Sequence, residues 1–160
     1  EIAQCLVGSE MCIRDRHDVE AGWLLCEAAR VLEDRQLMDR ANRLALDVTD
    51  ACLAEGLSDK GYMMYEKKGG RTTGHASWWG QIETMIACVN AWQISGNDVY
   101  LQSADTVWTF VKDCMIDREY GEWYSDCFDG EPKKDTPKVS MWRCPYHTVR
   151  LGVEIHNRLK

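Results

Sequence analysis

The chain has 160 residues, of which 45% are hydrophobic and 28% are charged, and its formal net charge is −7. This length and balance are typical of one globular domain that can bury a sizeable core. No apolar run reaches the length of a membrane span, and basic residues are scattered apart from a small group at Lys133, Lys134 and Lys138. Because nucleic-acid phosphates are bound by basic faces, we expect neither a nucleic acid nor a membrane as a partner.

Residues 1–16 do not fit any structural element. Their apolar residues follow neither helical spacing nor strict alternation, and Gly8 and Ser9 interrupt them. Ser9 to Asp15 can be back-translated as TCG GAG ATG TGT ATA AGA GAC, which resembles the transposase-end adapter of sequencing libraries, and the match extends from Cys5 into the codon of Arg16. We therefore expect a non-native leader over 1–16 and a native domain over 17–160; the alternative is a disordered or strand-like lead-in. The apolar stretch is too short for a signal peptide.

The sequence after residue 16 predicts five helices. Apolar residues at helical spacing predict them over Val19–Leu32, Leu37–Ala54, Ser77–Ile94 and Val99–Ile116, and a last helix starts near Pro145 and reaches Lys160. Asn97 or Asp98 is expected to cap the fourth helix. The helices come in pairs, as in a stack of helical hairpins, and no sequence repeat at a fixed period supports a solenoid.

Two long loops separate the helix pairs. The first follows Gly56 and is rich in glycine, and we expect a short hairpin around Tyr62 to Tyr65. The second covers Asp117 to Ser140. The six cysteines after residue 16 form no C-x-x-C pair, which predicts buried free thiols and a cytoplasmic, reducing compartment.

Three clusters of polar and aromatic residues lie at predicted helix starts. The first is "HDVEAGW", in which His17 and Glu20 are one helical turn apart; the second is "SWWGQIE"; the third is "MWRCPYHTVR", in which His147 follows Pro145. In an up-and-down helix array, alternate helix starts share one end, so these clusters can converge. Taken singly, each feature is more often local hydrogen bonding or core packing. His75 and His156 have no such surroundings, and we expect them at the surface.

Taken together and in this order, "HDVEAGWLL", "WWGQIE", "YGEWY" and "WRCPYHTVR" resemble the cellobiose 2-epimerase branch of the N-acylglucosamine 2-epimerase family. The resemblance extends from His17 to about Glu154. It implies an all-α fold, the C-terminal part of an (α/α)6 barrel, in which six helical hairpins form a ring around a central cavity. A full ring needs about twelve helices, so we expect a truncated barrel that is inactive by itself.

The resemblance also implies a set of site residues. His17 and His147 would be the catalytic acid/base pair, and Glu20 would assist them. The substrate-binding residues would be Trp23, Trp79, Glu83 and Trp142. No metal and no cofactor is implied. This sequence departs from the family pattern at Arg16, Gly80, Thr148 and Val149, which leaves the substrate preference open.

These residue types suit inversion at the carbon next to a sugar aldehyde. The C2 proton of an open-chain sugar is removable because the carbanion is delocalised into the carbonyl as an enediolate, and two imidazoles can serve as base and acid in either direction. We therefore expect conversion of glucose to mannose at the reducing end of a disaccharide such as cellobiose. Alternatives are an N-acylglucosamine 2-epimerase, an aldose–ketose isomerase, or, more distantly, an (α/α)6 glycoside hydrolase or glycan-binding protein.

Overall fold

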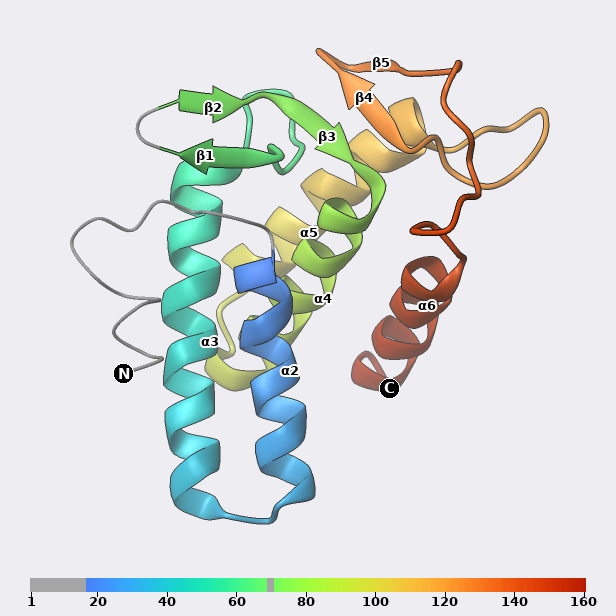
Figure 1. Cartoon of the computed structure of the whole chain (residues 1–160). Coiled ribbons are helices and arrows are strands. Elements are labelled where there is room, and N and C mark those ends of the chain that lie inside the picture. Colours follow the sequence, from blue (N-terminus) through green and yellow to red (C-terminus); the bar gives the residue numbers. More distant parts are fainter. Residues whose placement is uncertain (1–16, 69–70) are drawn as a thin grey trace.

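The computed structural model of this protein describes residues 17–68 and 71–160, and the expected leader at 1–16 lies outside them. The helices α2 (His17–Val31) and α3 (Arg35–Gly56) form one antiparallel hairpin, and α4 (Trp78–Ser95) and α5 (Val99–Phe110) form a second (Figure 1). The last helix, α6 (Tyr146–Arg158), has no hairpin partner among the described residues. All five helices predicted from the sequence are confirmed, with their ends shifted by a few residues.

Two helix ends differ in detail from the prediction. The α-helical part of α5 stops at Phe110, and the chain continues as a wider π-helical turn, Val111–Met115, before the loop. Before α5, the Asn97 carboxamide oxygen accepts a hydrogen bond from the N–H of Val99, whereas the Asp98 carboxylate accepts one from the Trp92 indole instead. Of the two candidate caps, Asn97 is thus the one that bonds the start of the helix.

Five short strands complete the part of the fold that the structure describes. β1 (Glu66–Lys68) and β2 (Arg71–Thr73) pair as a hairpin, whereas β3 (His75–Ser77), β4 (Asp126–Phe128) and β5 (Glu131–Pro132) form an antiparallel sheet in that order. We expected a hairpin at Tyr62 to Tyr65, but the hairpin strand β1 starts only at Glu66. At the expected position, the Gln81 side chain bonds both the N–H and the C=O of Met63 at 2.8 Å. That segment is therefore tied to α4. The three-stranded sheet was not predicted.

Helix α4 is the centre of the molecule. It contacts α2, α3, α5 and α6, and every residue from Gly80 to Ala91 is buried. Most of these residues are apolar, as a helix surrounded on all sides requires. Four are polar, however, and a buried polar side chain needs a hydrogen-bonding partner; they are Gln81, Glu83, Thr84 and Asn90.

Helix α6 is held to α2 and α4 largely by polar contacts. Its buried residue Arg158 donates to the side-chain oxygens of Asn90 and Gln93 on α4, at 3.0 and 2.9 Å, and pairs with Glu27 on α2. Only Leu151 of α6 joins the two main hydrophobic clusters. Because these bonds link residues far apart in the chain, helical periodicity gave no indication of them.

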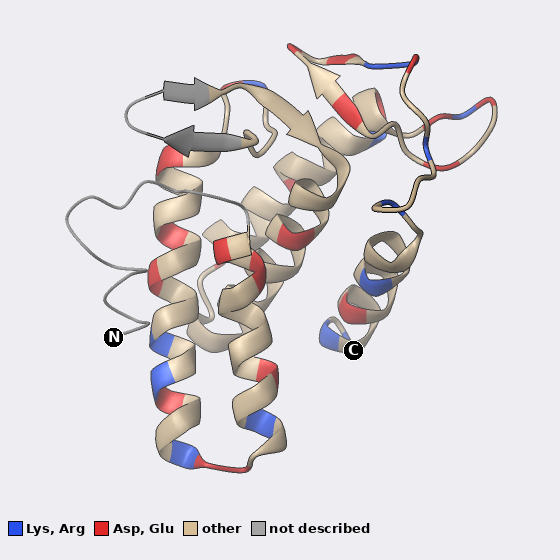
Figure 2. Cartoon of the chain, in the orientation of Figure 1, with Lys and Arg blue, Asp and Glu red and all other residues tan. Residues whose placement is uncertain are grey.

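The chain direction gathers the helix starts at one end. In Figure 1 the first residues of α2, α4 and α6 lie at the end where the strands and long loops are found, as the sequence argument anticipated. Acidic and basic residues both occur on α2, α3 and α6, whereas α4 and α5 carry only acidic ones (Figure 2). None of the described helices has the length and apolarity needed to cross a bilayer.

The described cysteines agree with the expectation of free thiols. Cys26, Cys52, Cys88 and Cys127 are buried and unpaired, Cys114 is partly buried, and Cys144 is exposed. Burial raises the pKa of the Cys52 and Cys88 thiols to about 12. These two thiols are therefore protonated and unreactive near neutral pH.

The start of α3 offers a test of local stability. The Asp34 carboxylate caps this helix by accepting from the N–H groups of Gln36 and Leu37 at 2.8 and 3.1 Å. We expect Asp34→Ala to lower the free energy of unfolding by about 1 kcal/mol and Asp34→Asn, which keeps a cap, to change it by a few tenths. Urea denaturation followed by tryptophan fluorescence would measure both, and equal losses for the two variants would contradict this role.

Candidate active site

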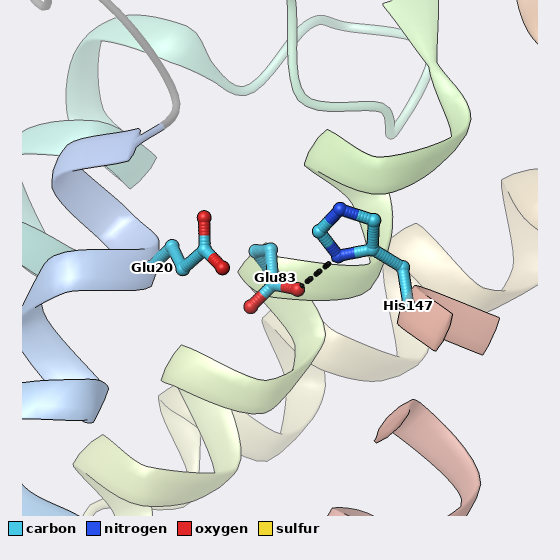
Figure 3. Close-up of side chains that lie close together, drawn as sticks. All are labelled: Glu20, Glu83 and His147. Carbon is cyan, nitrogen blue, oxygen red and sulfur yellow. Dashed lines mark hydrogen bonds and ion pairs between the residues drawn. The ribbon is translucent and has the colours of Figure 1, made fainter. Parts of the chain in front are cut away.

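The site is organised around the carboxylate of Glu83 on α4, whose side chain is fully buried. Its Oε2 accepts a hydrogen bond from the Trp23 indole N–H of α2 at 2.9 Å. Its Oε1 lies 2.7 Å from Nδ1 of His147 and 3.1 Å from Nη1 of Arg150, both on α6. A single buried carboxylate thus has donors from two other helices, and Figure 3 shows its contact with His147.

The contact with Glu83 determines which nitrogen of His147 can react. An ionised carboxylate only accepts hydrogen bonds, so the hydrogen in the 2.7 Å contact belongs to His147 Nδ1. In the neutral ring, Nε2 then carries the free lone pair, and in Figure 3 this second nitrogen points away from Glu83. A histidine oriented by a buried carboxylate in this way is arranged to accept a proton at Nε2.

Glu20 and Arg150 extend this network across α2 and α6. Nη1 of Arg150 donates to Oε1 of Glu20 at 2.7 Å as well as to Glu83. The Glu20 carboxylate, 17% exposed, therefore lies at the edge of the cluster while Glu83 lies at its centre. Burial acts to lower the pKa of Arg150, but the hydrogen bond to Glu20 and the charges of Glu83 and Glu20 outweigh it, and the pKa is raised.

The two candidate catalytic histidines meet at one tryptophan. His17, the first residue of α2, has its ring centroid 4.8 Å from that of Trp79. The His147 ring stacks on Trp79, with the two ring centroids 5.9 Å apart. Trp79 is the second residue of α4. The structure therefore brings together His17, His147, Glu20, Glu83 and Trp79, all five of which the sequence selected.

The other two tryptophans selected from the sequence lie differently. Trp23 is 3% exposed, and its ring lies under the guanidinium groups of Arg150 and Arg158. It belongs to the cluster, but as a buried donor to Glu83 rather than as an open wall. Trp142 is 82% exposed and lies on the turn bridged by Ser140 and Arg143. Its expected contact with a sugar stays a prediction.

Sequence reasoning missed both arginines around His147. Arg143 is buried; it donates to the Ser125 hydroxyl at 2.7 Å and to the Trp123 carbonyl, and its guanidinium lies 4.8 Å from the centroid of the Trp78 ring. It thereby anchors the loop from which α6 starts. Arg150 follows His147 by three residues, as Glu20 follows His17, so the same-face spacing in "HTVR" was an available signal.

His75 corrects one expectation. The sequence suggested a surface histidine without aromatic or acidic neighbours, but its ring stacks between Tyr65 at 4.4 Å and Phe128 at 5.0 Å. Its Nε2 also lies 3.6 Å from an oxygen of Asp126. Pairing of β3 with β4 produces this arrangement and could not be anticipated from the sequence. His156, by contrast, is exposed as expected.

The cluster also has the spacing of a metal site. Ligand atoms of Glu20, Glu83 and His147 lie within 4.8 Å of one another. However, both carboxylates already accept hydrogen bonds from Nη1 of Arg150, so a metal ion would first have to displace that guanidinium. The donor set therefore suits the charge of an arginine better than that of a metal ion.

Comparisons with known proteins identify the family. A family model described as N-acylglucosamine 2-epimerase (GlcNAc 2-epimerase) matches residues 11–150. The chain is 39% identical over 144 residues to a cellobiose 2-epimerase of Bacteroides fragilis, a match that covers 87% of this chain and 36% of that protein.

Solved structures of sugar epimerases are also similar to this chain. A sugar epimerase from a ruminal bacterium superposes with a TM-score of 0.85 at 34% identity, and a cellobiose 2-epimerase from Bacillus thermoamylovorans with 0.78 at 31%; each match covers 89% of this chain and 37% of the other. The chain thus spans little more than a third of the relatives that it matches. Its helical hairpins correspond to part of an (α/α)6 barrel, and the chain belongs to the N-acylglucosamine 2-epimerase family.

Proposed function

We propose that this chain is the C-terminal part of a sugar epimerase that inverts C2 of the reducing-end residue of a disaccharide such as cellobiose. The observation that supports it most directly is the meeting of His17 and His147 at the ring of Trp79, with His147 oriented by a buried carboxylate. Epimerisation needs a proton acceptor and a proton donor on opposite faces of one carbon, and two imidazoles meet that need.

In the proposed reaction, the ring-opened sugar presents its C2 between the two histidines. The free Nε2 of His147 accepts the C2 proton, and the electron pair is delocalised into the aldehyde as an enediolate. His17 then returns a proton to the other face, and the roles exchange in the reverse direction. Glu20, one turn from His17 and partly exposed, is placed to accept a hydrogen bond from a sugar hydroxyl, and Trp79 offers an aromatic face.

The arrangement of the carboxylates disfavours the glycoside hydrolase alternative. An inverting hydrolase keeps its two carboxyl groups roughly 6.5–9.5 Å apart, with a water molecule between them. Here oxygens of Glu20 and Glu83 lie within 4.8 Å, Arg150 bridges them, and Glu83 is fully buried with donors on both oxygens. Such a residue is suited to holding His147 rather than to attacking or protonating a sugar.

We further propose that the remaining length of the protein completes the ring. An apolar groove of about 610 Å³ lies between α4, α5 and α6, with Trp108, Leu151 and Ile155 among its lining residues. Val149 and Val153 of α6 are also at least half exposed. A second layer of helices would cover such surfaces. The tests below therefore use the intact protein, in which this chain is joined to that remainder.

Replacing either histidine tests the function. In the intact protein, His17→Ala and His147→Ala should each slow exchange of the sugar C2 proton with deuterated water by about 10²- to 10⁴-fold, the usual contribution of a positioned acid or base. Proton NMR of cellobiose, mannobiose and N-acetylmannosamine would measure the exchange and identify the preferred sugar. His156→Ala is the matched control, because His156 is on the same helix but lines the apolar groove rather than the cluster around Glu83. Sugar cleavage that persists in both variants without C2 exchange would instead support a hydrolase.

Glu83→Gln tests the orientation of His147. Whichever way the amide turns, its NH₂ group meets a donor already present, either Trp23 Nε1 or Arg150 Nη1. We expect a loss of about 1–3 kcal/mol in unfolding free energy, the cost of an unsatisfied buried donor, together with slower C2 exchange. Glu27→Gln removes an α2 carboxylate that pairs with Arg158 and should lower stability without slowing exchange per folded molecule. Wild-type exchange and stability in Glu83→Gln would contradict the role assigned to Glu83.

A further inference from the structure

One lysine of the small basic group in the second long loop is partly buried. The side chain of Lys138 is 23% exposed, and its ammonium group pairs with the Asp117 carboxylate and donates to the C=O of Gly121 at 2.9 Å. The ring centroids of Tyr124 and Tyr120 lie 5.1 and 5.8 Å from its Nζ. One loop thus surrounds this cation with two oxygen acceptors and two aromatic rings.

Asp117 is the acceptor that organises this loop. Its side chain is 4% exposed; Oδ1 accepts from the N–H groups of Glu119 and Tyr120 at 2.9 and 3.2 Å, and Oδ2 pairs with Lys138. The hydrogen bond from Lys138, together with those from the two N–H groups, holds the pKa of the Asp117 carboxyl well below its usual range, although burial acts to raise it. Asp117 is therefore ionised near neutral pH, and the pair is present there.

A second cation ties the same stretch of chain to this loop five residues later. The connection from β5 to α6 passes the loop of residues 117–125 (Figure 1), and Arg143 donates to the Ser125 hydroxyl and the Trp123 carbonyl of that loop. Residues 138–143 are therefore fastened at both ends. Backbone hydrogen bonds between Ser140 and Arg143, at 3.0 and 3.1 Å, close the turn between the two ties. Its exposed apolar residues are Val139, Met141 and Trp142.

The first turn of α6 depends on this segment for its position. Pro145 precedes the helix and has no side-chain group that could cap it. Leu151, which joins the main hydrophobic clusters, lies only in the second turn. His147, the second residue of α6, is therefore placed by the polar contacts around Glu83 on one side and by the chain that leads into the helix on the other.

We propose that Lys138 is a positioning residue of the epimerase site, because its pairing with Asp117 holds residues 138–143 where α6 can present His147 to the sugar. Lys138 acts through His147 and not on the reacting carbon. This assignment rests on the proposed function. A displacement of about 1 Å in a reacting group can cost about 100-fold in rate, so loosening the chain just before His147 should slow proton transfer more than it weakens sugar binding.

Two variants of the intact protein test the pair. Lys138→Met keeps an unbranched side chain but removes the charge. Asp117→Asn keeps an oxygen for the N–H groups of Glu119 and Tyr120 but turns an amide NH₂ group towards the Lys138 ammonium, donor against donor. We expect each to lower kcat for C2 exchange about 10-fold with KM changed much less. The double variant should lose no more than either single one, because both remove the same contact.

Lys60→Met is the matched control. Lys60 also pairs with an aspartate, Asp129, and donates to its carbonyl at 2.8 Å, but this pair joins the first long loop to the turn between β4 and β5. It leaves the chain that leads into α6 untouched, so kcat and KM should stay at their wild-type values.

Backbone hydrogen–deuterium exchange, followed by mass spectrometry, gives a readout that does not depend on catalysis. Exchange should become faster over residues 139–146 in Lys138→Met and Asp117→Asn, and it should stay unchanged there in Lys60→Met. Unchanged exchange over residues 139–146 in the first two variants would show that the pair does not hold this segment, and it would overturn the proposal.

The kinetic outcomes separate this proposal from the proposed function. An active unsubstituted protein whose kcat is unchanged in Lys138→Met overturns the role of Lys138 and leaves the epimerase proposal standing. A rise in KM alone does the same, because it places the effect on sugar binding and not on His147. No C2 exchange by the unsubstituted protein with any of the three sugars overturns the function and, with it, this assignment. Should Lys138→Met fail to fold, Asp117→Asn decides by the same measurements.

Discussion

Burial of the Glu83 carboxylate in the central helix is the constraint on which the rest of this structure depends. A buried charge is tolerated only when it is paired and hydrogen-bonded. Trp23 of α2 and His147 and Arg150 of α6 supply the required donors. Neither helix can shift far along α4 without leaving one of these contacts unmade, and the pairing that stabilises the carboxylate also sets the relative positions of the helices.

Buried polar side chains of α4 also need hydrogen-bonding partners further towards its C-terminal end. Asn90 and Gln93 lie about two and three turns further along the helix than Glu83, and they accept from Arg158 of α6, which also pairs with Glu27 of α2. Two arginines of α6 therefore join α2 and α4 at two levels, with the Trp23 ring under both. Such contacts depend on geometry far more than apolar packing does, so they favour one arrangement of the three helices over its alternatives.

The location of the site follows from the direction of the chain. Helices α2, α4 and α6 start at the same end of the molecule, and His17, Trp79 and His147 are each within the first two residues of their helix. The short strands lie at that end as well, and Arg143 anchors the loop before α6 through Ser125 and Trp123. Rigid helices thus fix the directions of the reactive groups, while loops determine what surrounds them.

The sequence by itself determined the five helices, their pairing into hairpins, and which ends carry the chemistry, because apolar spacing, caps and residue types in one helix turn are local properties. It also selected six of the residues that the structure brings together, Trp23 among them. The tertiary structure decided the surroundings of three side chains: it makes Trp23 a buried donor, leaves Trp142 exposed and places His75 in an aromatic stack. It also decided the β3–β4–β5 sheet and the roles of Arg143, Arg150 and Arg158. Each of these depends on the partner that a side chain meets across the fold, and helical or strand periodicity carries no information about partners so distant in the chain.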